Sequence, residues 1–132
     1  MNRQQDHAAL ARRLWEAGAR GDPEPFYALY APGAVLRVHG HGIVSGEHKG
    51  VDAILDFLAR CGESVDELCS DLLEVYASDG GAVMRYRTLG ERGGRHLDLE
   101  YLYVLRIQDQ RIVEADLVPT DRQRSDEFWS LD

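Results

Sequence analysis

The adjacent glycines Gly93 and Gly94 constrain the fold of this chain more than any other feature of its sequence. They separate two runs of alternating residues, 82–90 and 96–107, and such a pair is typical of the two-residue turn of a β-hairpin. If the glycines form the centre of the turn, Arg92 faces Arg95 and Arg87 faces Glu100. A longer loop containing both glycines is the alternative, and it would shift this register.

The hairpin register divides the side chains between two faces. Arg87 and Glu100 form a charge pair on one face. The other face carries only apolar or hydroxyl-bearing residues: Met84, Tyr86, Thr88, Leu99, Tyr101 and Tyr103. A buried phenol needs a hydrogen-bond partner. Three tyrosines on one face therefore suit a partly open cavity in which hydroxyls orient a ligand. The alternative is that the rings belong to the core and their hydroxyls reach the backbone or water.

The rest of the chain predicts helices on one side of an antiparallel sheet. Helical spacing and capping residues predict four helices, over about 7–20, 23–31, 51–61 and 122–129. Asp6 is expected to cap the first of these helices and Asp121 the last. Alternation predicts strands over 35–39, 68–76, 82–90, 96–107 and 111–118, with a loop or short edge strand over 40–46. This order indicates an α+β fold in a single domain over residues 1–132.

The charge balance argues against several classes of partner. There are 15 Lys and Arg residues against 23 Asp and Glu residues, a net charge of −8. Phosphate backbones and anionic membrane surfaces would repel such a chain, so we expect neither nucleic acid nor membrane as a partner. No run of about 18 apolar residues is present, and the N-terminus lacks the apolar stretch of a signal peptide. We therefore expect a cytoplasmic protein.

The cysteines and histidines give no metal signature. Cys61 and Cys69 are too few for a disulfide framework and lack metal-ligand spacing, so we expect both to be reduced and half-buried. His39, His41 and His48 fall close together but have no nearby pair of carboxylates. The sequence also lacks a glycine-rich phosphate loop. We expect no metal and no cofactor.

Several segments together resemble one protein family. They are 29–35, Gly46 to Gly50 leading into a helix, Gly93-Gly94-Arg95, 111–114 and 126–129. In order and spacing they resemble the SnoaL-like, polyketide cyclase-like group of the nuclear transport factor 2-like superfamily, which also contains ketosteroid isomerases. The resemblance covers about residues 5–130. It implies a cone-shaped barrel, in which a curved, mostly antiparallel sheet wraps against three N-terminal helices. It also implies a central pocket and a homodimer through the outer sheet face.

The catalytic residues of the superfamily are not reproduced at the matching positions. The oxyanion-binding tyrosine of the isomerases falls on Leu14, and their general base falls on Val38 or His39. The superfamily also contains limonene epoxide hydrolases, and their catalytic carboxylate falls on Leu117, while the adjacent Asp116 points to the opposite face of a strand. We therefore expect this chain to catalyse neither ketosteroid isomerisation nor epoxide hydrolysis of the usual type.

The remaining candidates for chemistry are few. His39 ends the first strand and titrates in the range suited to a general base, and the alternative is a solvent-facing histidine. Tyr101 and Tyr103 could donate hydrogen bonds to a developing enolate or alkoxide. A carboxylate in an apolar pocket could act as an acid. However, Asp116 shares its face with Glu114, and Asp121 fits a helix cap.

These residues support two hypotheses. In the first, the protein binds a small hydrophobic polyketide-, terpenoid- or steroid-like molecule. It isomerises, cyclises or dehydrates this molecule without a cofactor, with His39 as base and Tyr101 or Tyr103 as oxyanion donor. In the second, it is a non-catalytic ligand-binding or dimeric scaffold domain of the same fold. The residues expected to line the pocket are Trp15, Val38, Phe57, Met84, Tyr86, Leu99 and Leu117.

Overall fold

The computed structural model describes residues 2–131 and contains four helices and one six-stranded sheet. The helices are α1 (Arg3–Arg20), α2 (Glu24–Leu29), α3 (Val51–Glu63) and α4 (Arg122–Phe128). The strands are β1 (Tyr30–Val38), β2 (Gly46–Lys49), β3 (Glu67–Ala77), β4 (Gly81–Arg92), β5 (Arg95–Gln108) and β6 (Arg111–Pro119). None of the described helices is long and apolar enough to cross a membrane.

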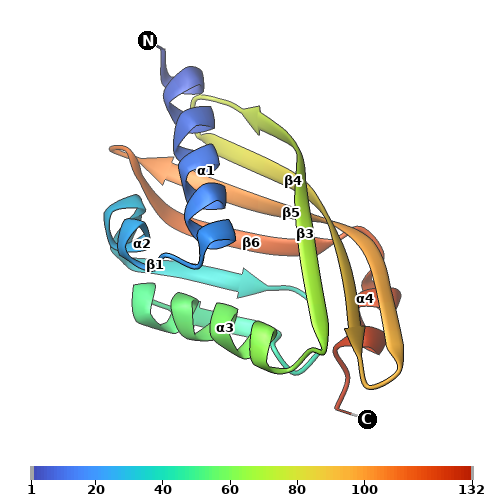
Figure 1. Ribbon diagram of the computed structural model, residues 1–132. Helices are drawn as coiled ribbons and strands as arrows, with labels where there is room; N and C mark the ends of the chain where they lie inside the picture. Colours follow the sequence, from blue (N-terminus) through green and yellow to red (C-terminus); the bar gives the residue numbers. More distant parts are fainter. Residues whose placement is uncertain (1, 132) are drawn as a thin grey trace.

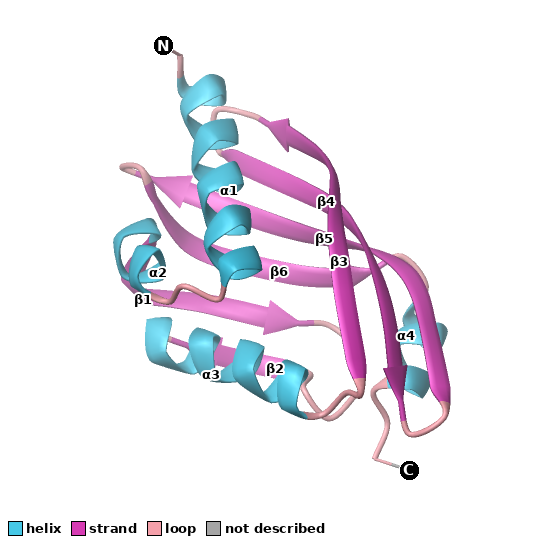
Figure 2. Ribbon diagram, in the orientation of Figure 1, coloured by secondary structure: helices cyan, strands magenta, loops and turns pink. Residues whose placement is uncertain are grey.

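The sheet is strongly curved, and α1 and α3 lie over its concave face (Figure 1). Its strand order is β2-β1-β6-β5-β4-β3, so β2 and β3 form the two edges. All neighbouring strands are antiparallel except β1 and β6, which are parallel. The predicted α+β cone is confirmed, but the sheet is open rather than closed into a barrel. A fourth helix, α4, lies near the β4–β5 turn (Figure 2).

The β4–β5 hairpin has the register that its two glycines predict. Arg92 faces Arg95, and Gly93 and Gly94 adopt φ angles of +54° and +83°. These positive angles are those of a type I′ turn, which glycine adopts without steric cost. Arg87 faces Glu100 across the ladder, as expected. Its guanidinium instead binds Asp98 diagonally, with N–O distances of 2.7 and 2.8 Å.

The first half of the chain differs from the sequence prediction at two boundaries. The cap of α1 is Asn2 rather than Asp6, because the Asn2 side chain accepts the backbone N–H of Gln5 and the Gln5 side chain binds back. Tyr30 was expected on the apolar face of the second helix but begins β1. The strand therefore passes through Pro32 and Gly33, which were expected to end a helix.

The C-terminal segment closes one end of the molecule. Asp121 caps α4, as predicted, by accepting the backbone N–H of Arg124. Phe128 and Trp129 are buried. The Phe128 ring lies against the sheet at Gly90, where an added Cβ would stand 3.0 Å from it. A glycine in β4 therefore permits the close approach of the C-terminal segment.

Candidate functional site

The concave face of the sheet carries four tyrosines, and three of them form hydrogen bonds within the protein. The hydroxyl oxygens of Tyr30 and Tyr103 are 2.7 Å apart in the buried interior. The Tyr101 hydroxyl lies 2.8 Å from Oγ of Ser125, and the indole N–H of Trp129 donates to it at 3.3 Å. These side chains therefore satisfy one another's hydrogen-bonding groups, and the bonds of Tyr101 link α4 and the C-terminal segment to the sheet.

Tyr86 is different, because its hydroxyl forms no hydrogen bond with any residue in the range 2–131. Within that range, the only buried side-chain nitrogen or oxygen without a partner is Nε of Arg92. The Tyr86 side chain is thus mostly buried but its oxygen is not completely enclosed, and desolvation by burial raises the pKa of this phenol well above its usual range. A mostly buried phenol without a hydrogen-bond partner is available to hydrogen-bond a ligand.

Two aromatic side chains and one thiol surround Tyr86. The centroid of its ring lies 5.1 Å from that of Trp15 on α1 and 5.8 Å from that of Tyr101, with which it stacks. The Cys61 thiol on α3 is close enough to raise the pKa values of both Tyr86 and Tyr101. Helices α1 and α3 and strands β4 and β5 thus each contribute one of these four side chains.

The seven residues predicted to line a pocket divide into two groups. Four are buried as part of the hydrophobic core: Val38, Phe57, Met84 and Leu99. The other three, Trp15, Tyr86 and Leu117, pack against the core but retain accessible surface. Leu117 is notable because its cross-strand neighbours on the same face, Val38 and Tyr103, are both buried.

Burial raises the pKa of every titratable group in this region for which a shift is resolved. The pKa values of Tyr30 and Tyr86 lie well above the usual range, and that of Tyr101 is raised. Desolvation raises the pKa of Tyr103 to about 12 and that of the Cys61 thiol to about 12. These groups are protonated at neutral pH, so they can donate hydrogen bonds but are poor bases.

His39 lies on the opposite, convex face of the sheet. Its Nε2 is 2.8 Å from Oδ1 of Asp116, and its side chain is 45% exposed. Arg37 lies on the same face and forms ion pairs with Glu114 and Asp116. Of the two placements considered from the sequence, the structure has the solvent-facing one. It therefore does not bring His39 together with Tyr101 and Tyr103.

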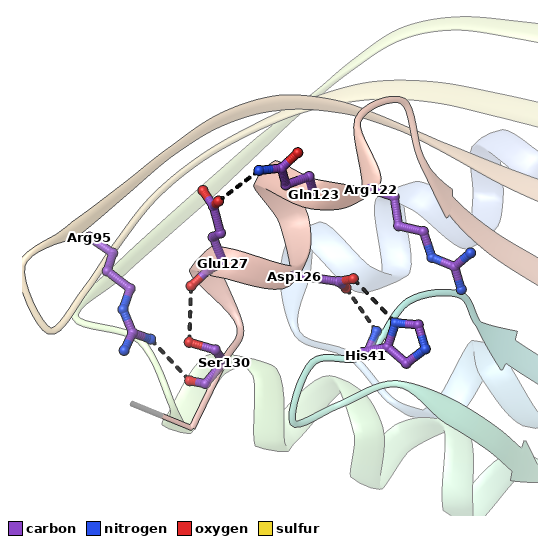
Figure 3. A pocket seen from close by; sticks show the side chains of 7 residues that line it. All are labelled: His41, Arg95, Arg122, Gln123, Asp126, Glu127 and Ser130. Carbon is purple, nitrogen blue, oxygen red and sulfur yellow. Dashed lines mark hydrogen bonds and ion pairs between the residues drawn. The ribbon is translucent and has the colours of Figure 1, made fainter.

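One hollow lies outside the cone, beside α4 (Figure 3). It has a volume of about 910 Å³ and is lined by His41, Arg95, Arg122, Gln123, Asp126, Glu127 and Ser130. Asp126 points at His41, accepting its backbone N–H at 2.8 Å and lying 3.5 Å from its Nδ1. This contact holds the loop after β1 against α4. Positive and negative side chains mix in this hollow, so it selects neither charge.

A second hollow of about 630 Å³ lies at the free edge of the sheet. Its lining comes from β3 and the adjoining ends of β4 and β5: Glu67, Leu68, Cys69, Leu89, Gly90, Glu91, His96 and Leu97. Cys69 is exposed there rather than half-buried, whereas Cys61 is half-buried as expected, and both are free thiols. Across residues 2–131, no three His, Cys, Asp or Glu side chains are grouped to hold a metal ion.

Sequence reasoning did not include Tyr30, Cys61 and Ser125 among the residues of this region. Cys61 could have been found, because it continues the helical stripe of Ile54 and Phe57 by four residues. Tyr30 was assigned to a helix, and the approach of Ser125 to Tyr101 depends on how α4 packs, which has no local signal.

The open, curved sheet with helices on its concave side and aromatic side chains within defines an α+β cone protein. The model of the SnoaL-like domain matches residues 11–115, and the chain belongs to this family. An uncharacterised protein of Mycobacterium tuberculosis is 28% identical over 92% of this chain and 94% of its own length. Bal32a, from a soil-derived mobile gene cassette, is 29% identical, with a TM-score of 0.90 over 97% of this chain and 99% of its own. TerC, crystallised with polyporic acid, shares the fold at 12% identity, with a TM-score of 0.80 over 93% and 97%.

Proposed function

We propose that the protein binds a small, mostly apolar molecule inside the cone, beside Trp15, Tyr86 and Leu117. The observation that carries this proposal is the accessible surface that these three side chains retain, although Val38, Met84, Tyr101 and Tyr103 around them are buried. Interior positions that stay accessible are typical of an unfilled apolar hollow. The crystallisation of TerC with polyporic acid is consistent with a ligand in this fold.

The protonation states favour binding over acid–base turnover. A cofactor-free isomerase, cyclase or dehydratase needs a group that accepts a proton near neutral pH. The phenols and the Cys61 thiol have raised pKa values, and His39 lies on the other face of the sheet. We therefore place the ligand-binding alternative ahead of catalysis by His39 with Tyr101 or Tyr103.

The proposal can be tested by filling the proposed site. Leu117→Phe adds volume on the concave face, and Leu89→Phe makes the same substitution at an exposed position of β4, on the convex face. Overpacking a filled core costs typically about 1–3 kcal/mol. We expect Leu117→Phe to fold with little loss of stability and to abolish the NMR shift changes caused by acetophenone, while Leu89→Phe preserves them. A strongly destabilised Leu117→Phe protein, together with an absence of acetophenone binding to the wild type, would contradict the proposal.

We also propose that two copies associate through the convex sheet face. Tyr76, Val83 and Val104 face one another across three strands there, and Leu102 and Val118 continue this apolar strip. Ion pairs flank the strip, including Arg85–Glu100 and Arg106–Glu114. The face therefore carries charges of both signs and is complementary to itself. Light scattering should give twice the 14.9 kDa chain mass, and Val104→Lys should give the monomer. A monomeric wild-type protein would contradict the dimer.

A further inference from the structure

The distribution of charged side chains on the inner face restricts what the proposed site can bind, and this inference rests on the proposed function. Inward positions from Met84 to Gly90 on β4, and from Leu97 to Leu105 on β5, carry no charged side chain. The same holds for the inward positions Leu36 and Val38 on β1 and for Leu117 on β6.

Two cations, Arg92 and Arg95, do occur on this face, at the turn end of the hairpin, and both donate to backbone carbonyls, although Nε of Arg92 has no partner among residues 2–131. Arg92 donates hydrogen bonds to the carbonyl oxygens of Phe128 and Ser130, at 3.1 and 2.6 Å. Arg95 donates to the same two carbonyls, at 3.4 and 3.0 Å. These arginines hold the C-terminal segment in place.

On β2, the inward-facing His48 has its Nε2 3.2 Å from the carbonyl oxygen of Val44. The cross-strand neighbours of Tyr86 are Leu72 and Tyr101, so a ligand beside Tyr86 meets no cationic side chain at these positions.

An ionised ligand would lose its hydration in such a place without gaining a counter-charge. Transfer of a carboxylate into an apolar environment is costly unless it is paired with a cation. A neutral ligand avoids this cost. Conversely, a hydrocarbon would leave the Tyr86 hydroxyl without a partner as it displaced the solvent from it, and a buried donor without an acceptor is also unfavourable.

We infer that the ligand is a neutral molecule with a flat apolar part beside Trp15 and an acceptor oxygen to which the Tyr86 hydroxyl donates a hydrogen bond. The ring contacts support the flat part, because Trp15, Tyr86 and Tyr101 follow one another at 5.1 and 5.8 Å. The protonated state of Tyr86 at neutral pH supports its role as the donor. Tyr86 is thus a specificity-determining residue of the proposed site.

Three probes of similar size separate the components of this inference. Acetophenone is neutral with a carbonyl acceptor, isopropylbenzene is neutral without one, and benzoate is an anion. Each is titrated into the full-length protein at neutral pH and followed by two-dimensional NMR. We expect acetophenone to bind roughly threefold to tenfold more tightly than isopropylbenzene, the range that one hydrogen bond provides. We expect benzoate to bind more weakly than both.

The variant Tyr86→Phe removes only the hydroxyl, and Tyr27→Phe is the matched control, since the Tyr27 hydroxyl binds Asp52 on the exterior. The preference for acetophenone over isopropylbenzene should disappear in Tyr86→Phe and persist in Tyr27→Phe. Equal binding of the two neutral probes to the wild type, or tightest binding of benzoate, would overturn the inference while leaving a ligand site in the cone. If none of the three probes shifts the signals of inward-facing residues, the proposed function fails and the inference fails with it.

Discussion

Nε2 of His39 and Oδ1 of Asp116 lie 2.8 Å apart on the convex face of the sheet, where His39 directly follows β1 and Asp116 belongs to the parallel strand β6. The pair lies on the face opposite to the tyrosines, because side chains alternate along each strand and Val38 and Leu117 point inward. The residue best suited to general-base chemistry is thus separated from the apolar interior by the sheet itself.

This separation predicts that His39 has little influence on the ligand. His39→Gln should leave the affinity for acetophenone within a factor of about two, because the pair does not reach the interior. An exposed ion pair contributes typically about 0.2–1 kcal/mol, so the free energy of unfolding should fall by no more than that. Urea unfolding and NMR titration of the same variant measure the two quantities. A large loss of affinity would restore His39 to the binding site.

The Tyr30–Tyr103 pair predicts strong coupling between two buried hydroxyls. Tyr30→Phe or Tyr103→Phe alone leaves the other hydroxyl buried without a partner, at a cost of about 1–3 kcal/mol. The double variant removes both polar groups, so it should lose clearly less stability than the two single losses combined. A double-mutant cycle by urea denaturation measures the coupling. Additive losses would show that each hydroxyl finds another partner in solution.

The raised pKa values predict a loss of stability in alkali. Folding holds the Tyr103 pKa at about 12, above its ordinary value of 10.0, and the Cys61 pKa at about 12, above 9.0. The unfolded chain therefore releases these protons first, so stability is fully present below about pH 9 and falls as the pH rises toward 12. Ultraviolet absorption should show the buried phenols ionising together with unfolding. Ionisation of all six tyrosines near pH 10 in the folded protein would disagree.

The turn between β3 and β4 supplies a test of packing with its own control. A Cβ added to Gly81 would overlap the carbonyl oxygen of Leu105, whereas a Cβ added to Gly80 would meet only Oγ of Ser78, at 3.9 Å. Gly81→Ala should therefore cost several kcal/mol or prevent folding, while Gly80→Ala should change stability by less than about 1 kcal/mol. Thermal unfolding of both variants measures the contrast. Equal stabilities would mean that the strand end relaxes freely.

Much of the fold could be predicted because its strongest signals are local. Gly93 and Gly94 determine the hairpin register, and alternation then assigns Tyr86, Tyr101 and Tyr103 to one face. The same alternation separates His39 from Val38. By contrast, Tyr30 is apolar and follows a helical stripe, so nothing local marks it as the first residue of a strand.

The candidate site was less predictable because it depends on how distant elements pack. Whether Tyr101 is free or bonded depends on Ser125 and Trp129, which approach it only after α4 docks on the sheet. Whether Tyr86 is paired depends on helices α1 and α3, which contribute Trp15 and Cys61. Sequence periodicity places each residue on a face but does not determine which hydroxyl stays unpartnered.

The most direct test of the central claim is a crystal structure under xenon pressure. Xenon enters apolar hollows whatever their natural ligand is, and its anomalous scattering identifies its position. We predict a xenon atom on the concave side of the sheet, in contact with Trp15, Tyr86 and Leu117. Leu117→Phe, collected in the same way, should lose this atom. An interior without xenon in the wild-type crystal, with the side chain of Tyr86 closed over by its neighbours, would contradict a ligand site within the cone.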